Sequence, residues 1–145
     1  MSRTYLLDTS TASYIIKDRS PQARRNFLRA VVEDEVCISA LTEAEIRHGL
    51  ARRQVSVAMQ TAVGEFLAKI EVLPWESAAA RAYAHARATL ERIGKPLANM
   101  DLLIAAHAAA LGAVLVTSDQ TLTECAKHID VRQTVNWAHD VGARA

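Results

Sequence analysis

Four acidic residues stand at positions from which their carboxylates could act together: Asp8, Glu45, Asp101 and Asp119. Asp8 ends the apolar run Thr4–Leu7, and Asp119 lies two residues beyond AVLVT, the most strand-like segment of the chain. Glu45 and Asp101 fall in the first turns of two expected helices. In parallel α/β sheets, strands end and helices begin at one edge, where functional sites form. We therefore expect the four carboxylates to converge there.

Each of these acids also has a purely structural interpretation. Asp8 could cap the helix that follows it, and Glu45 could close a capping box with Thr42. Asp101 would complement a helix dipole, and Asp119 would suit a turn. For any one acid alone the structural interpretation is the better one. Four acids crowded at one point repel each other, however, and such crowding usually implies a bound cation.

The ligand chemistry of this cluster favours Mg²⁺ or Mn²⁺ over zinc, because carboxylates bring only oxygen and no His or Cys stands beside them. Such an ion can activate a water, hold a phosphate oxygen and neutralise the charge of an in-line displacement. Hydrolysis of a phosphodiester bond needs these three capabilities. Cys37 and Cys125 lack the C-x-x-C spacing of a metal site, so we interpret them as small buried hydrophobes.

Length and composition are those of one globular domain, which we assign to residues 1–145. Half of the residues are hydrophobic and 23% are charged. Because no apolar run approaches the roughly 20 residues of a membrane span, and the start MSRTYLLDTS does not suit a signal peptide, we expect a cytoplasmic protein without membrane contact. The net charge of +1 is compatible with RNA binding without supporting it.

Short apolar runs and amphipathic segments alternate along the chain. Strands are expected at Thr4–Leu7, Glu35–Ser39, Ile70–Leu73, Ala113–Thr117 and near Val131–Val135. Helices are expected at Thr9–Lys17, Pro21–Val32, about Thr42–Arg53, Ser56–Lys69, Ser77–Ile93, Asn99–Leu111 and around Thr121–Lys127. The apolar side of the second helix is assigned to Phe27, Leu28, Val31 and Val32. This alternation predicts an α/β fold with a central parallel sheet of about five strands and helices on both faces.

The chain resembles the PIN-domain family, and within it the VapC-type toxins of prokaryotic toxin–antitoxin pairs. Four segments carry the resemblance: YLLDTS at Asp8, ISALTEAEIRHG at Glu45, GKPLANMDLLIAAHA at Asp101 and LGAVLVTSDQTL at Asp119. Their order and spacing match the family over essentially the whole chain. In the second segment the family's acid stands four residues before a glycine, which selects Glu45, before Gly49, rather than Glu43.

The resemblance implies an endoribonuclease that depends on Mg²⁺ or Mn²⁺ and often acts on tRNA or other structured RNA. It also implies a homodimer neutralised by a cognate VapB-type antitoxin. Two positions depart from the family's pattern. Ser10 replaces the Asn of the first motif, and many members carry Asn where Asp119 stands, so Asp119 is the metal ligand that the resemblance supports least.

An antitoxin arginine could pair in bidentate fashion with two of the carboxylates and replace the charge of the metal. The helices Thr9–Lys17 and Thr42–Arg53 border Asp8 and Glu45, and we expect the antitoxin to dock on them.

Four hydroxyl residues flank two of the acids: Thr9, Ser10, Thr117 and Ser118. They could orient the carboxylates or the attacking water, and they could equally cap helix starts. Four basic residues on the expected Glu45 helix are candidates for binding RNA phosphates, although each alone suits a solvated helix face: Arg47, His48, Arg52 and Arg53.

Other functions fit the sequence less well. An aspartyl phosphatase needs a second Asp two residues after the first, where Ser10 stands. A Mg²⁺-binding receiver-like signalling module would carry an acceptor Asp at the end of the third strand, and IEVLPW offers none. A catalytically inactive PIN scaffold that acts by binding remains an alternative, although all four acids are present.

Overall fold

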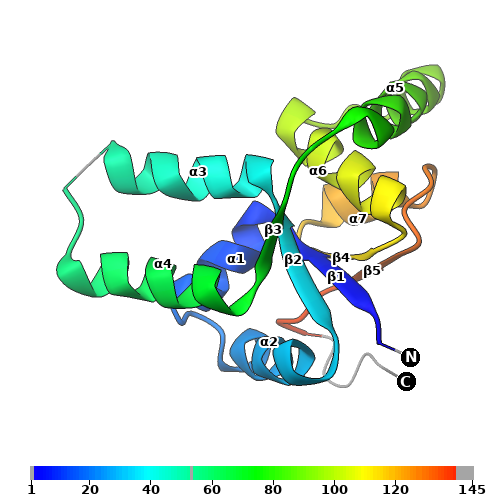
Figure 1. Ribbon diagram of the computed structural model, residues 1–145. Helices are drawn as coiled ribbons and strands as arrows, with labels where there is room; N and C mark the ends of the chain where they lie inside the picture. The colour runs from blue at the N-terminus through cyan, green and yellow to red at the C-terminus, as the bar shows by residue number, and fades with distance from the viewer. Residues whose placement is uncertain (1, 53, 140–145) are drawn as a thin grey trace.

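Five parallel strands form the centre of this computed structural model, which describes residues 2–52 and 54–139 (Figure 1). Their spatial order is β3-β2-β1-β4-β5. The strands are β1 (Thr4–Leu7), β2 (Glu35–Ser39), β3 (Glu71–Leu73), β4 (Val114–Val116) and β5 (Gln133–Val135). The expected parallel sheet of about five strands is confirmed, and only strand ends differ, by one or two residues.

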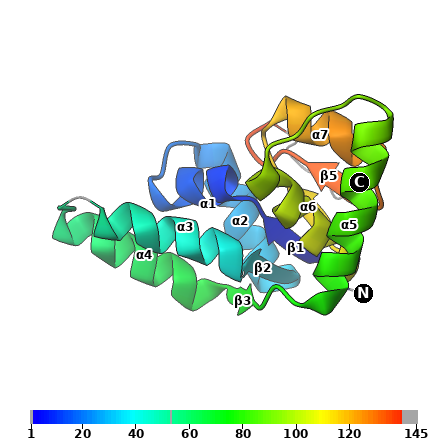
Figure 2. The ribbon, with the colours of Figure 1, turned by 90° about the horizontal axis from the view of Figure 1, so that it is seen from above.

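Seven helices cover the sheet within the described residues. They are α1 (Thr9–Ile16), α2 (Pro21–Glu33), α3 (Ala40–Ala51), α4 (Val57–Lys69), α5 (Ser77–Arg92), α6 (Asn99–Leu111) and α7 (Gln120–Ala126). Figure 2 shows α1 to α4 on one side of the strands and α5 to α7 on the other. The sheet is thus the middle of three layers.

The two faces of the sheet bury alternate residues, because successive side chains of a strand point to opposite sides. Tyr5 and Leu7 pack with Phe27 and Trp137 in the core under α1, α2 and α4. Leu6, between them, belongs to the opposite core under α5, α6 and α7. A strand buried on both faces has a continuous apolar sequence, which is why TYLL predicts β1 correctly.

The start of α3 differs from the sequence expectation. Ser39 caps the helix, since its hydroxyl accepts from the Leu41 N–H at 3.1 Å, so the helix begins at Ala40 and not at Thr42. The capping box expected between Thr42 and Glu45 was therefore wrong. Glu45 lies in the second turn, and Thr42 is fully buried.

The predicted apolar side of α2 was wrong in part. Phe27 is buried, but Leu28 and Val32 are 39% and 85% exposed. The helix instead packs through Phe27 together with the small residues Ala23 and Ala30. The prediction relied on the spacing of large apolar side chains. When a helix lies close to its neighbours, however, small alanines can form its buried face.

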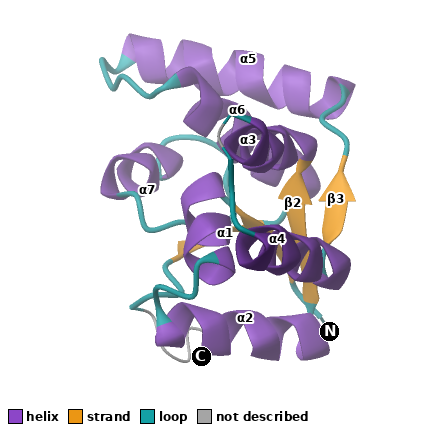
Figure 3. Ribbon diagram, turned by 90° about the vertical axis from the view of Figure 1, so that its left-hand side faces the viewer, coloured by secondary structure: helices purple, strands orange, loops and turns teal. Residues whose placement is uncertain are grey.

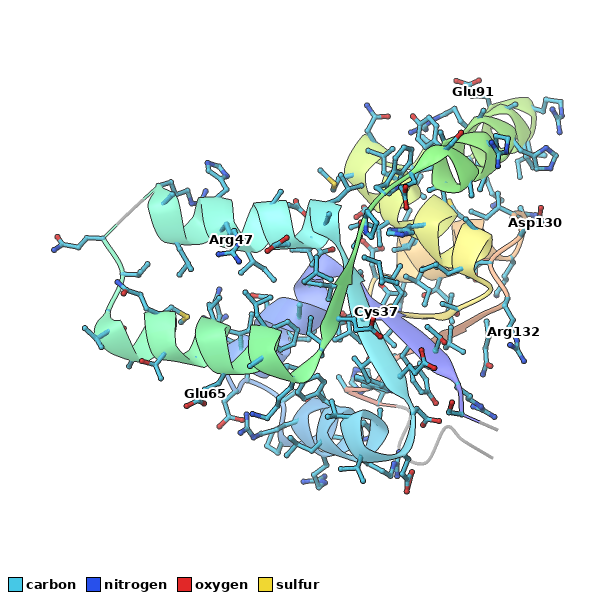
Figure 4. All side chains as sticks on the ribbon, viewed as in Figure 1. Cys37, Arg47, Glu65, Glu91, Asp130 and Arg132 are labelled. Carbon is cyan, nitrogen blue, oxygen red and sulfur yellow. The ribbon has the colours of Figure 1, made fainter. Side chains whose placement is uncertain are left out.

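The remaining sequence expectations concern cysteines and membranes. Both cysteines are buried and free, as expected. Cys37 lies within the sheet on β2 (Figure 4), where burial raises the pKa of its thiol to about 12. In the part of the chain that the structure describes, no helix is long and apolar enough to cross a membrane.

Candidate active site

The sheet reverses its strand order at β1, which pairs with β2 on one side and β4 on the other. All five strands run parallel, so their carboxyl ends meet at one edge, and Figure 3 shows β2 and β3 pointing the same way toward α3 and α6. Asp8 directly follows β1, and Asp119 follows β4 by three residues. In open α/β sheets, such a switch point is where ligands bind.

Asp8 is held rigidly at the end of β1. Its backbone N–H donates to the Val116 carbonyl at 3.0 Å, which continues the pairing with β4. Its carboxylate caps α1 by accepting from the Thr11 N–H at 2.9 Å. The capping and functional interpretations therefore concern the same side chain. Asp8 is only 5% exposed, and burial raises the pKa of its carboxyl; hydrogen bonds from Thr117 and Thr11 oppose that rise, and the charge of Asp119 adds to it.

The buried Thr117 hydroxyl joins Asp8 to the loop that carries Asp119. It donates to the Asp8 carboxylate and accepts from the Asp119 N–H at 3.0 Å. The Asp119 side chain in turn caps α7 by accepting from the Leu122 N–H at 3.0 Å. Asp119 is exposed at the surface of the site.

Glu45 reaches the site from α3 through Thr9, the first residue of α1. The Thr9 hydroxyl donates to the Glu45 carboxylate and lies 3.2 Å from the Thr42 hydroxyl. Thr9 is thus held between two residues that lie one helical turn apart on α3. This contact fixes the side chain of Glu45 relative to the helix that Asp8 caps.

Asp101 stands in the first turn of α6, as predicted. No side chain caps this helix at Ala98. The guanidinium of Arg87 on α5 instead fixes the segment before Asp101, because it donates to the Asn99 side-chain oxygen at 2.7 Å and to the Leu97 carbonyl at 3.1 Å. The same guanidinium lies 5.5 Å from the centre of the Tyr83 ring.

The carboxyl of Asp101 lies within reach of the charges of the other three acids. Burial raises the pKa of its carboxyl most, and the negative charges of Asp119, Asp8 and Glu45 raise it further. Within residues 2–52 and 54–139, no three His, Cys, Asp or Glu side chains lie close enough together to enclose a single ion. The negative charges of the other acids therefore reach Asp101 at this edge of the sheet, but the carboxylates do not surround a single ion-sized position.

The flanking hydroxyl residues divide into three that hold the site and one that does not. Thr9 and Thr117 contact acids directly, as described above. The Ser118 hydroxyl lies 3.0 Å from that of Tyr14 on α1. Ser10 is exposed and makes no hydrogen bond to the described residues. The sequence analysis missed Tyr14 and Arg87, because neither stands near an acid in the sequence.

Of the predicted RNA-contacting residues, Arg47 and His48 lie on the outer part of α3, and Arg52 directly follows that helix. Arg47 is exposed and pairs with Glu43 of the same helix at 2.9 Å (Figure 4). His48 and Arg52 are exposed as well. Arg53 lies outside the described residues. The pairing with Glu43 favours the solvated-face interpretation for Arg47.

Two hollows flank the acids. The first, of about 270 Å³, lies among α1, α3 and α4 and is mainly apolar; Thr9, Glu45, Lys17 and Arg52 contribute its polar lining with Ser13. The second, of about 440 Å³, lies beyond the ends of β4 and β5, on the side of Asp119, and all of its lining residues except Val135 carry polar side chains. The acids thus stand between an apolar hollow and a polar one.

A family model of the PIN domain matches residues 5–128. The chain therefore belongs to the PIN-domain family.

Within that family, the proteins to which it is similar carry VapC names. It is 34% identical over 116 residues to the tRNA(fMet)-specific endonuclease VapC of Salmonella typhimurium, covering 79% of this chain and 86% of that protein. It is 29% identical over 133 residues to the ribonuclease VapC2 of Haemophilus influenzae, covering 92% and 97%.

Solved structures agree with this assignment. VapBC2 from Rickettsia felis, bound to a DNA fragment from its promoter, matches with a TM-score of 0.82 and 28% identity over 92% of this chain and 98% of that one. DNA-bound VapBC from Salmonella typhimurium matches with a TM-score of 0.80 and 28% identity over 94% and 99%. The PIN fold predicted from the sequence is confirmed.

Proposed function

We propose that this chain is a metal-dependent endoribonuclease of the VapC kind, a toxin that a cognate antitoxin restrains. One observation carries the proposal: the charges of three carboxylates from distant segments, Asp119, Asp8 and Glu45, all raise the pKa of Asp101 at the carboxyl edge of the sheet. Its relatives are named as ribonucleases, which supports hydrolysis of RNA phosphodiester bonds in the cytoplasm. The relatives named for tRNA(fMet) favour a tRNA or another structured RNA as the substrate.

The donor chemistry of the site fits Mg²⁺ or Mn²⁺. Every candidate ligand is a carboxylate oxygen, and the uncompensated repulsion at Asp101 is what a cation would relieve. Mg²⁺ usually keeps several waters and takes only one or two protein carboxylates directly. A group of carboxylates that does not enclose the ion is compatible with this coordination preference. We assign Asp8, Glu45 and Asp101 as ligands, with Asp119 as the outermost member.

When bound, the ion supplies an activated water and neutralises charge at the phosphate in an in-line displacement. The residues of the chain position the reactants. Asp8 stays fixed by its hydrogen bonds from Thr11 and Thr117, and Thr9 orients Glu45. Preorganised groups of this kind act without moving during the reaction, which is what makes their contribution large.

The apolar hollow among α1, α3 and α4 is our proposed docking site for the antitoxin. The helices expected from the sequence, Thr9–Lys17 and Thr42–Arg53, correspond to α1 and α3; Met59 and Val63 of α4 complete the lining and were not expected. Thr9 and Glu45 border the same hollow, so a chain lying in it reaches the acids. An arginine of that chain would pair with two carboxylates and occupy the place of the ion.

The competing functions gain no support from the site. β3 ends at Leu73 with no acidic residue at its carboxyl end, where a receiver module carries its acceptor Asp. Ser10, at the position where an aspartyl phosphatase carries its second acid, is exposed and cannot replace that acid. We also propose a homodimer, in keeping with the VapC resemblance, and size-exclusion chromatography with light scattering measures it directly.

The deciding experiment incubates the purified protein with end-labelled structured RNA and with tRNA, in Mg²⁺, in Mn²⁺ and in EDTA. We expect endonucleolytic cleavage with either ion and none in EDTA. Unchanged cleavage in EDTA would contradict the metal assignment, and RNA left intact under all conditions would contradict the nuclease assignment. Expression alone should arrest growth, and co-expression of a neighbouring small antitoxin gene should relieve the arrest.

A further inference from the structure

The polar hollow beside Asp119 has a lining that suits one particular part of an RNA chain. Its volume is about 440 Å³, within the range of small-molecule sites. It lies outside the carboxyl ends of β4 and β5 and against the first turns of α7. The lining residues are Thr117, Ser118, Gln120, Thr123, Glu124, Thr134, Val135 and Asn136.

The charges of the lining exclude a phosphate as occupant. No lysine or arginine lines the hollow. Its one ionisable side chain is Glu124, whose carboxylate lies 2.9 Å from the Lys127 ammonium, on the exposed side of α7. A phosphate is held by cations and backbone N–H groups, whereas ribose hydroxyls and base edges are read by neutral donors and acceptors. Hydroxyl and amide side chains of this kind make up most of the lining.

Two side chains of the lining are available to a ligand, and two others are not. The hydroxyls of Ser118 and Thr123 already bond within the protein, to Tyr14 and to the Asp119 carbonyl respectively. The Gln120 amide and the Thr134 hydroxyl make no hydrogen bond to the described residues. An amide offers both donors and acceptors, and a hydroxyl offers one donor and two acceptor positions.

The hollow adjoins the loop that carries Asp119, although none of the four acids lines it. Asp119 stands between Ser118 and Gln120, which both line it, and Thr117 lines it while holding Asp8. A phosphodiester bound at the carboxylates would have its neighbouring sugar and base near this hollow, because Thr117, Ser118 and Gln120 belong to both regions. The hollow on the other side is mainly apolar and lies beyond Glu45.

We propose that this hollow binds the nucleoside next to the scissile phosphate, with Gln120 and Thr134 contacting its base edge. The inference rests on the proposed ribonuclease function and deepens it, because it names the residues that set base preference at one position beside the cut.

The test compares Gln120→Ala and Thr134→Val with wild-type protein on an RNA pool randomised around the cleavage site. Base preference at one flanking position should fall by about 3- to 10-fold, the loss expected from one hydrogen bond, while the other positions keep theirs. Gln133→Ala is the matched control: it is also an exposed glutamine, one residue from Thr134 on β5, but it does not line the hollow. Its profile should equal that of the wild type.

A second measurement does not depend on cleavage. RNA containing 4-thiouridine is photocrosslinked to the Asp8→Asn protein, and the attached peptide is identified by mass spectrometry. Attachment within residues 117–124 or 133–136 supports the inference, even if the wild-type protein proves unable to cleave RNA and the nuclease proposal fails. Attachment only elsewhere overturns the inference. Active Gln120 and Thr134 variants with an unchanged preference at every position overturn it as well.

Discussion

The Thr117 hydroxyl accepts a hydrogen bond from the Asp119 N–H at 3.0 Å while it donates one to the Asp8 carboxylate. One buried side chain thus links the two acids at the switch point between β1 and β4. Its geometry uses both the donor and the acceptor capacity of a hydroxyl. Neither capacity could be served by a valine of the same shape.

Thr117→Val should lower kcat by about 10- to 100-fold, the usual cost of losing a residue that orients metal ligands. The hydroxyl lowers the pKa of Asp8, so its removal should move the acidic limb of the pH–rate profile to higher pH. Thr117→Ser keeps the hydroxyl and should retain most activity and the original limb. Equal losses in both variants would mean that packing, and not the hydrogen bond, matters.

Glu45→Gln should abolish cleavage, whereas Glu43→Gln should leave it nearly unchanged. The reason is placement: Thr9 holds Glu45 at the site, while Glu43 pairs with Arg47 on the outer face of α3. Loss of that exposed pair should cost at most about 1 kcal/mol of stability. Cleavage rates and urea midpoints of the two variants decide the matter, and the opposite pattern would show that the wrong acid has been assigned.

Arg87→Ala should reduce activity by about 100-fold, because a displacement of about 1 Å in a reacting group can cost that much. Arg87 touches no acid; it fixes Leu97 and Asn99, just before Asp101. The Mg²⁺ concentration that gives half-maximal activity should rise, and calorimetry should show weaker Mg²⁺ binding. Arg81→Ala, an exposed arginine bonded to Ser77 of the same helix, is the control. Mg²⁺ binding that stays as tight in Arg87→Ala as in that control would rule out the positioning role.

Asp101→Asn should raise the Tm at pH 7 in EDTA although it abolishes activity. Burial and the other three acids raise the pKa of Asp101 in the folded protein. A carboxyl with a raised pKa makes the folded protein less stable as pH rises through that pKa, so removing the charge stabilises it. The gain should vanish as pH falls below about 4, where the carboxyl is protonated in both states. Asp130→Asn, on the exposed loop marked in Figure 4, should show no such gain.

His107 should make the fold sensitive to mild acid. It is 3% exposed on α6, burial lowers its pKa, and its Nδ1 has no hydrogen-bond partner in the described part of the chain. A histidine with a lowered folded-state pKa stabilises the fold above its unfolded value of about 6.5, and that stability is lost as pH falls. Urea unfolding at a series of pH values from 8 to 5 measures how the free energy of unfolding changes with pH. His107→Gln should flatten this dependence, and exposed His85→Gln should not.

The order and type of the elements could be predicted from the sequence because their signals are local. TYLL and AVLVT are continuous apolar runs, as strands buried on both faces require. Gly94 and Gly112, with φ of +68° and +64°, stand just beyond α5 and at the end of α6, where a left-handed residue ends a helix. Asp8, Asp101 and Asp119 were found because each stands near the end of a strand or the start of a helix, whereas Glu45 was chosen over Glu43 by its spacing to Gly49, as in the PIN-domain family.

Thr9 and Thr117 could be named as supports from the sequence because they flank acids, whereas the distant supports were decided by tertiary structure alone. Arg87 lies 14 residues before Asp101, and Tyr14 lies 104 residues before Ser118. The start of α3 moved from Thr42 to Ala40 because the packing of α1 against α3 buries Thr42 beside Thr9 and leaves Ser39 as the cap. Element types follow from neighbours in the chain, whereas hydrogen bonds between elements, and here the start of α3, depend on which faces meet after folding. A single sequence therefore identifies the acids, and only the folded chain shows what holds them in place.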